Sequence, residues 1–451
     1  MAKGKRVLII LLSMVSATVV LLIVLTLPVL LRQAAASEGL LADYSAATRP
    51  FDYQPESNAA PLYQRAIELY VDRPETIRTN GSPWDMDSTE LEAFRKWLEA
   101  NAACHKSFML ASQKPYCWFD RHNESGKLRD MDFNPDLTGL KRLAELVASQ
   151  AKIRAFDRDP QTAFALLLDL RRTGGHLMGN HETWIHQLVG LAVSNLCYST
   201  AFDIVQNMNL SADTLAAFQQ KLTHAVNTSP QYISYTEGEL LFNRESIHEV
   251  FTDNENGSGK VIPSQLKEQL GETIFGHDSV SYPQACWIAL WHPDKRQTLQ
   301  TLDKIAAYVN SACRETPWQL RQKGTGMSEE ILKLAGKNRC LQRLDIIAML
   351  HRIQHQQIAC AGALVTTVAV LRYRADKGEF PVSLGELTRA GYLDAAPQDP
   401  YTNDSLIYRT TDSDFILYSV GADFNDDGGN HVGWSSDRPG DYVFWPIQNE
   451  R

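Results

Sequence analysis

The feature that most constrains this chain is a long apolar run without charge. Residues 7–31 hold 25 residues, and only serine and threonine interrupt the apolar ones. A helix rises about 1.5 Å per residue, so the run is long enough to cross the roughly 30 Å hydrocarbon core of a bilayer. We therefore expect a transmembrane helix over residues 7–31, with the lipid bilayer as its partner.

Basic residues flank this run unequally. Three precede it and one, Arg32, follows directly; the three are Lys3, Lys5 and Arg6. Because positive charge is retained on the cytoplasmic side, residues 1–6 are predicted to be a cytoplasmic tail. Residues 33–451 would then fold outside the cytoplasm, in the periplasm, on a single-pass protein of the cell inner (cytoplasmic) membrane.

A cleaved signal peptide is the alternative for this run. Three alanines at 34–36 supply small residues of the kind found at cleavage sites. However, the apolar run is far longer than the roughly 7–15 residues that such signals use. The next longest apolar stretch, 358–371, has the length of a buried core helix. The length favours an uncleaved anchor.

Composition limits the classes of function. The chain carries a formal net charge of −9, with 44% hydrophobic and 22% charged residues. These values are typical of a globular protein and argue against nucleic acid as a partner, which requires a basic face. Seven cysteines without a C-x-x-C pair do not suggest a zinc ribbon. Outside the cytoplasm they would form zero to two disulfides.

The pattern over residues 58–337 predicts a mainly α protein. Apolar residues recur there at helical spacing without a fixed repeat, which indicates an irregular multi-helix body. Residues 32–57 are expected to be a linker. Gly174 and Gly175 are expected to interrupt a helix, and 253–285, rich in glycine, serine and asparagine, to be a loop.

Several titratable residues in this body invite comparison with known sites. In HETWIH, His181 and His186 are five residues apart, whereas the zinc helix H-E-x-x-H needs four. His176 has the same defect relative to His181, so packing histidines are the favoured interpretation. The remaining candidates are a histidine pair at helical spacing and four glutamates on one predicted helix: His351, His355, Glu237, Glu239, Glu245 and Glu249.

None of these groups nominates a reaction. Zinc needs three or four ligands, and the histidine pair supplies two. Paired carboxylates can hydrolyse glycosides, but a run of glutamates on a helix is more often a solvated face. The chain has no G-x-S-x-G, no P-loop and no dinucleotide fingerprint. We therefore name no catalytic residue, and an enzyme is the less favoured reading.

Residues 341–451 have a different pattern, which predicts a small α+β unit. A long helix should end at Lys377, before Gly378. A short helix follows, and the β-forming runs after it predict an antiparallel hairpin and a third strand: 383–390, 406–409, 415–420 and 442–445.

This unit resembles the C-terminal globular domain of major pseudopilins from type II secretion systems. The matching pieces are RYRADKGEFP, LGELTRAGYL, PQDPY, LIYR and LYSVGADFNDDGG. They lie between residues 372 and 429, and the resemblance extends to about 445, roughly a quarter of the chain. The prepilin processing motif is missing, so the resemblance implies the fold and its calcium loop rather than assembly into a pseudopilus. Similar tails end many uncharacterised membrane-anchored bacterial proteins.

The loop also has chemistry of its own. Asp423, Asn425 and Asp427 alternate before Gly428, and alternating oxygen side chains can converge on a hard cation such as calcium. The twelfth position of an EF-hand would be a tryptophan here, so this is no EF-hand. The resemblance adds Asp441 and loop carbonyls as ligands. A structural calcium site is predicted, and a polar turn without metal is the alternative.

Three functions follow as hypotheses. The first is a membrane-anchored extracytoplasmic scaffold or binding protein for an envelope protein or peptide. The second is a cell-envelope hydrolase with an unfamiliar helical site, around His176–His186 or Glu237–Glu249. The third, a secretion-system component, rests on the resemblance alone.

Overall fold

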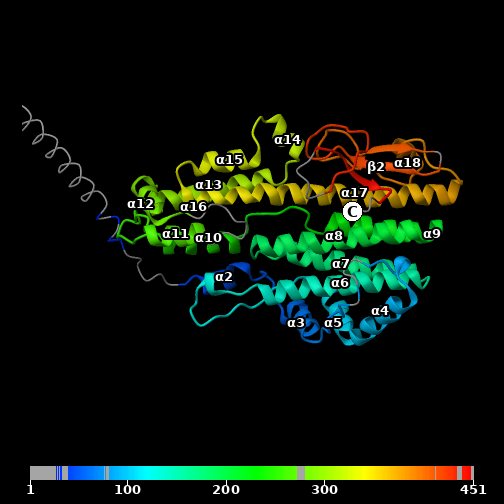
Figure 1. Cartoon of the computed structure of the whole chain (residues 1–451), viewed down its shortest axis with the longest axis horizontal. Coiled ribbons are helices and arrows are strands. Elements are labelled where there is room, and N and C mark those ends of the chain that lie inside the picture. The colour runs from blue at the N-terminus through cyan, green and yellow to red at the C-terminus, as the bar shows by residue number, and fades with distance from the viewer. Residues whose placement is uncertain are drawn as a thin grey trace, which may run out of the picture.

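The structure is a computed structural model, and it is mainly helical with one small sheet near the C-terminus (Figure 1). It describes residues 39–75, 77, 81–271, 280–411, 413–433 and 439–447, together with 27, 29, 31 and 32. The predicted transmembrane run 7–31 therefore lies almost entirely outside the described residues.

The elements follow one another in this order. The helices are α2 Leu41–Thr48, η1 Pro55–Ser57, α3 Ala60–Glu68, η2 Pro83–Asp85, α4 Ser88–Ala100, α5 Ala102–Ser112, η3 Leu128–Asp130, α6 Asn134–Phe156, α7 Pro160–Gly179, α8 Trp184–Asn207, α9 Ala212–Thr228, α10 Glu237–Val250, α11 Pro263–Gly271, α12 Tyr282–Trp291, α13 Lys295–Ala312, α14 Pro317–Gln322, α15 Met327–Ala335, α16 Arg339–Gln342, η4 Arg343–Ile346, α17 Ile347–Lys377 and α18 Leu384–Arg389. The strands are β1 Ile407–Thr410, β2 Phe415–Ser419 and β3 Tyr442–Trp445.

Helices α7 and α8 pack closely because glycine permits it. A Cβ atom on Gly174 would lie 2.8 Å from the carbonyl oxygen of Gly190 and closer still to the Ser194 side chain. The prediction that Gly174 and Gly175 interrupt a helix is therefore wrong. The glycines lie inside α7, and at Gly174 the missing side chain allows the close approach of a neighbouring helix.

Two hydrophobic cores divide the body, and α17 joins them. The first core holds α3–α9, the C-terminal half of α17 and the sheet; the second holds α10–α16 and the start of α17. Figure 1 shows α17 running along most of the molecule, with the sheet against one end and α10–α12 near the other. We call the boundary between the two cores the seam. A polar group buried at the seam is enclosed by residues of both cores.

Two helices in the described part of the chain are long and apolar enough to cross a membrane by length and composition. They are Trp184–Asn207 and Arg339–Lys377, and most of each apolar window is buried inside the protein. Core helices of a globular protein are buried in the same way and pass the same test of length and composition.

The C-terminal unit has the predicted arrangement of a long helix and three antiparallel strands. The sheet order is β1-β2-β3, and Tyr408 pairs with Leu417 in the first ladder. Gly378 ends α17 in the left-handed conformation, at a φ of 84°. Phe415 stacks on Trp445 at 5.4 Å between ring centroids. The expected mainly helical class with a small C-terminal sheet is confirmed.

Two predicted loops contain helices. Residues 41–48 of the expected linker 32–57 form α2, whose Tyr44 is fully buried. The expected loop 253–285 contains α11 and the start of α12. Each of these three helices is ten residues or shorter, so none has enough turns to show a clear helical period in the sequence.

Candidate binding cleft and the buried charges behind it

A cleft of about 500 Å³ opens beside the end of α7. Its walls come from four separate segments: the turn after α2, the loop after α5, the end of α7, and the turn after α9. The lining residues are Thr48, Pro50, Phe51, Ser112–Trp118, Arg172, Gly175, His176, Gly179–His181 and Thr228–Pro230. A volume of this size is within the range of small-ligand sites.

Aromatic side chains form one wall of the cleft. Phe51 is fully exposed, whereas Trp118 is buried and lies edge-on to Tyr53, with centroids 5.2 Å apart. The Tyr116 hydroxyl donates to the Gln54 carbonyl at 2.8 Å and accepts from its backbone N–H at 2.7 Å. These two hydrogen bonds attach the segment after Phe51 to the opposite loop, so the wall is held in place.

A half-exposed guanidinium lies in the cleft. Arg172 donates to the buried carboxylate of Asp169 at 2.5 Å, and Ser112 and Gln113 donate to the same oxygen. Burial raises the pKa of Asp169, while Ser112 and Arg172 oppose the rise. The arginine side chain keeps 46% of its exposure. The bond to Asp169 therefore fixes the position of the Arg172 guanidinium, which remains partly exposed at the cleft.

His176 lines the cleft but has no free nitrogen. Its Nε2 lies 2.7 Å from the Lys114 carbonyl, which only accepts, so this nitrogen carries the proton. Its Nδ1 lies 3.0 Å from the Tyr63 hydroxyl. Burial lowers the pKa of His176 to about 4. The imidazole is neutral at ordinary pH and holds the loop after α5 against α7.

Asn180 lines the cleft and has an unpaired acceptor that is buried beneath its surface. The residue is 8% exposed, its Nδ2 donates to Glu182 at 3.3 Å, and its Oδ1 has no hydrogen-bond partner among the described residues. A buried amide oxygen without a partner costs about 1–3 kcal/mol.

Behind the cleft lies a buried ionic cluster, formed by Glu182, His186, Arg121, Asp136 and Tyr44. His186 Nε2 lies 2.8 Å from Glu182 Oε2, and Arg121 Nη2 lies 3.5 Å from the same oxygen. The other end of the guanidinium meets Asp136 at 2.5 Å, and the Tyr44 hydroxyl donates to Glu182.

The environment of Glu182 decides its charge. Burial alone would raise the pKa of Glu182, but His186 and Arg121 outweigh burial and the pKa is lowered. The carboxylate is therefore ionised and neutralised within the protein. HETWIH thus contains a hydrogen-bonded pair four residues apart, between Glu182 and His186, rather than a metal motif. The sequence analysis compared only the histidines and missed this spacing.

The four glutamates of α10 serve different structural purposes. Glu239 is buried, accepts from Trp184 N and Asn243, and has a pKa raised by burial. Glu245 accepts three backbone N–H groups, from Leu40, Leu128 and Arg129.

The other two glutamates of α10 lie nearer the surface. Glu237 is exposed beside His181, at 3.2 Å, and Glu249 pairs with Lys127 and Arg129. Each of the four carboxylates is thus engaged by neighbouring residues of the protein.

His351 and His355 lie against each other on α17, with ring centroids 4.4 Å apart. His351 Nε2 lies 2.8 Å from the Glu315 carbonyl, and Gln354 donates to His355 Nε2 at 3.1 Å. Burial lowers both pKa values, that of His355 to about 3, with His351 adding to the shift. They are neutral packing groups in the second core.

The C-terminal loop brings some of its predicted ligands together. Asp423 accepts from Gly440 N at 2.9 Å, and the buried Asp441 accepts from Asp427 N and Gly429 N. The side chains of Asn425 and Asp427 belong to exposed residues. Asp423 and Asp441 therefore lie in one loop cluster, whereas the alternation does not place all four side chains inward.

Among the residues that the structure describes, no three histidine, cysteine or acidic side chains form a group that could hold a metal ion. A site at this loop would thus take two carboxylates and main-chain carbonyls. All seven cysteines are unpaired, and six of them are buried. Burial raises the pKa of Cys117, which lines the cleft, well above its usual range, so its thiol is not a ready nucleophile.

Comparison of the chain with protein-family models, with curated proteins and with solved structures found no match. The candidate site therefore rests on the geometry alone. Sequence reasoning missed Arg172, Asp169 and Asn180. One local signal was present, since Asp169 and Arg172 lie three residues apart on one helix.

Proposed function

We propose that this protein is a membrane-tethered, extracytoplasmic binding protein whose cleft takes a short peptide with a free carboxylate. The observation that carries the proposal is the cleft itself. It places a positioned guanidinium and an aromatic wall around one volume of about 500 Å³. Arg172 would take the carboxylate, and Phe51 an apolar side chain.

The geometry favours binding over hydrolysis at this place. Both nitrogens of His176 are engaged, the Cys117 thiol is buried, and Glu182 is paired internally. General acid–base work requires a group that can reach the substrate and change protonation near the working pH. The association with a secretion system remains a proposal from the resemblance of the C-terminal unit.

A thermal-shift screen of the full chain in nanodiscs tests the binding proposal. The probes are pooled tetrapeptides with free C-termini and the same pools amidated. We expect a raised melting temperature with the free acids only. Arg172→Gln should weaken the response tenfold or more, since a hydrogen bond to a charged group contributes about 1.5–3 kcal/mol. Arg65→Gln, an exposed arginine paired with Glu68, is the matched control. Failure of every pool to bind would remove the proposal.

The tether is supported by Arg32, which directly follows the apolar run. Its Nη1 donates to the carbonyls of Val261 and Ala289 at 2.7 and 3.2 Å, and Val29, near the end of the run, is already buried in the second core. Ala289 belongs to α12, which has no charged residue and exposes Trp287 and Trp291 by 65% and 66%. Exposed tryptophans beside an anchor are typical of the membrane interface.

Quenching by brominated lipids tests this placement in the full chain reconstituted into vesicles. Lipids brominated near the headgroup should quench part of the tryptophan fluorescence, and the Trp287→Ser, Trp291→Ser double variant should lose that part. Equal quenching of both proteins would show that α12 does not touch the bilayer. Full-length protein that stays in solution without lipid or detergent would instead contradict the tether.

We also propose calcium as a structural ion of the C-terminal loop. Asp423 and Asp441 are its side-chain ligands, with main-chain carbonyls completing the shell. Their presence in one loop cluster supports the proposal. The ion would stabilise the loop between β2 and β3, which makes few hydrogen bonds to the strands of the sheet.

A further inference from the structure

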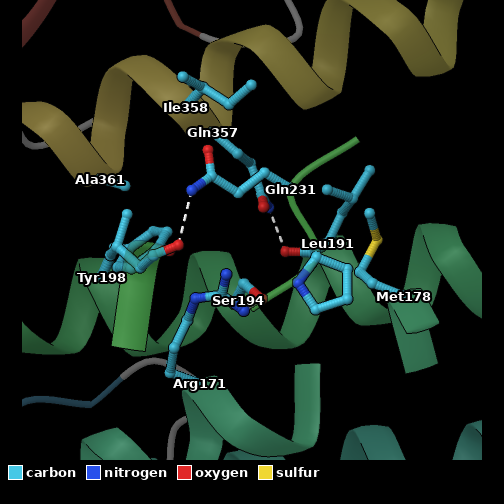
Figure 2. A pocket seen from close by; sticks show the side chains of 11 residues that line it. Arg171, Met178, Leu191, Ser194, Tyr198, Gln231, Gln357, Ile358 and Ala361 are labelled. Carbon is cyan, nitrogen blue, oxygen red and sulfur yellow. Dashed lines mark hydrogen bonds between the residues drawn. The ribbon is translucent and has the colours of Figure 1, made fainter. Parts of the chain in front are cut away.

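A second, smaller cavity lies on the seam between the two cores (Figure 2). Its volume is about 20 Å³, and α7, α8, α17 and the turn after α9 enclose it. The lining residues are Arg171, Met178, Leu191, Ser194, Tyr198, Val226, Pro230, Gln231, Gln357, Ile358 and Ala361. Such a volume holds about one particle of the size of water.

Arg171 is the unusual member of this cavity. It is 3% exposed, its Nη1 reaches Ser194 Oγ only at 3.5 Å, and its Nε has no hydrogen-bond partner. The Tyr198 hydroxyl lies beside the same guanidinium. No carboxylate among the described residues forms an ion pair with Arg171. The neighbouring Arg172, by contrast, is bound to Asp169.

A buried guanidinium cannot lose its charge as a lysine or histidine can. Without a counter-ion its burial is costly, and buried charges in proteins are accordingly paired. The cavity beside Arg171 is therefore the place where a counter-ion is needed.

The cavity has the donors that an anion requires. Figure 2 shows Arg171 facing Gln231 and Gln357 across the cavity. Each glutamine uses one amide N–H internally, Gln231 on Val226 O and Gln357 on Leu191 O, and so holds its carboxamide in place. The Arg171 guanidinium, the Tyr198 hydroxyl and a second N–H on each amide are the donors around the cavity.

We propose that this cavity is a binding site for a small monovalent anion, of which chloride is the size that fits. The anion neutralises Arg171 and connects α7, α8 and α17 across the seam. The site is separate from the peptide cleft, although Pro230 lines both, and it does not depend on the function proposed for the cleft.

Bromide replaces chloride chemically and scatters anomalously, so it locates the site directly. Crystals of the full chain grown with sodium bromide should give an anomalous peak within hydrogen-bond distance of the Arg171 guanidinium. A map with bromide on the surface and none beside Arg171 would overturn the proposal. This measurement uses the wild-type protein, so it does not depend on the folding of any variant.

Thermal melts at constant ionic strength give the second test. Replacing gluconate by chloride should raise the wild-type melting temperature by about 1–3 °C for each tenfold increase above the dissociation constant. Arg171→Met should remove this dependence, and Arg65→Gln should keep it. A chloride response that survives in Arg171→Met, or is missing in the wild type, would contradict an anion at this site.

Discussion

Two buried arginines in neighbouring regions of the helical body differ in whether a carboxylate lies beside the guanidinium. Arg121 lies between Asp136 and Glu182 and over the rings of Phe119 and Phe133. Arg171 has a serine and a tyrosine beside it and a cavity in front of it. The first charge is neutralised by the fold. The second charge lacks a counter-ion within the described part of the chain, so it indicates a binding site where the first indicates structure.

The largest expected effect comes from breaking the internally neutralised cluster. Glu182→Ala should lower the free energy of unfolding by about 3–5 kcal/mol, because Arg121 and His186 lose their shared acceptor while buried. Urea denaturation measures the loss.

Glu237→Ala is the matched control for this comparison. It removes an exposed carboxylate whose pairing with His181 contributes under about 1 kcal/mol. If both variants lose the same stability, the cluster around Arg121 is not the structural element described above.

The next largest expected effect is a dependence of the free energy of unfolding on pH, caused by the buried His355. His355 has a pKa of about 3 in the folded chain, below its ordinary 6.5. Between these values the unfolded chain binds a proton that the folded chain does not. The stability that His355 contributes is therefore complete above pH 6.5 and falls by about 1.4 kcal/mol for each pH unit below it.

His355→Gln should flatten this slope, which urea midpoints at pH 7, 6 and 5 would show. His122→Gln changes an exposed histidine and should leave the slope unchanged. The same slope in His355→Gln as in the wild type would exclude His355 as its source.

The third prediction concerns the acidic residues of the C-terminal loop, which would bind a cation, calcium. With millimolar calcium and a dissociation constant of about 10⁻⁴ M, the ion adds about 1.4 kcal/mol. Chelation should lower the melting temperature by about 1–3 °C, and Asp423→Asn should be insensitive. Exposed Asp404→Asn is the control. A melt of the wild type that does not change in chelator would reject the calcium ion.

The smallest expected effect couples the two cavities. Pro230 lines both, so an anion beside Arg171 should hold one wall of the cleft. We expect chloride to tighten peptide binding about twofold to fivefold, below most allosteric couplings. Titrations in chloride and gluconate measure it, and Arg171→Met should abolish the difference.

The sequence predicted the C-terminal unit better than the cleft, for a physical reason. Gly378, the alternation after Phe415 and the turn between the strands are local signals, and the unit forms from neighbours in the chain. The cleft forms from Phe51, the loop after α5, the end of α7 and the turn after α9. These segments meet only through packing, so no pattern within one segment could indicate the cleft.

Small residues and short helices caused the other wrong predictions. A glycine pair such as Gly174 and Gly175 favours a helix break when only the sequence of α7 is considered. The close contact of Gly174 with the neighbouring helix α8 is the reason for a glycine at this position. The short helix α2 has no clear period, yet its Tyr44 reaches the buried Glu182. In both places the decisive contact is more than fifteen residues away along the chain.

The most direct test of the account is a calorimetric cycle on the cleft. A tetrapeptide that binds is titrated as its free acid and as its C-terminal amide into the wild type and into Arg172→Gln. The account predicts that the wild type prefers the free acid by about tenfold or more and that Arg172→Gln has no preference. An equal preference in both proteins would show that Arg172 does not receive the carboxylate and would contradict the proposed function of the cleft.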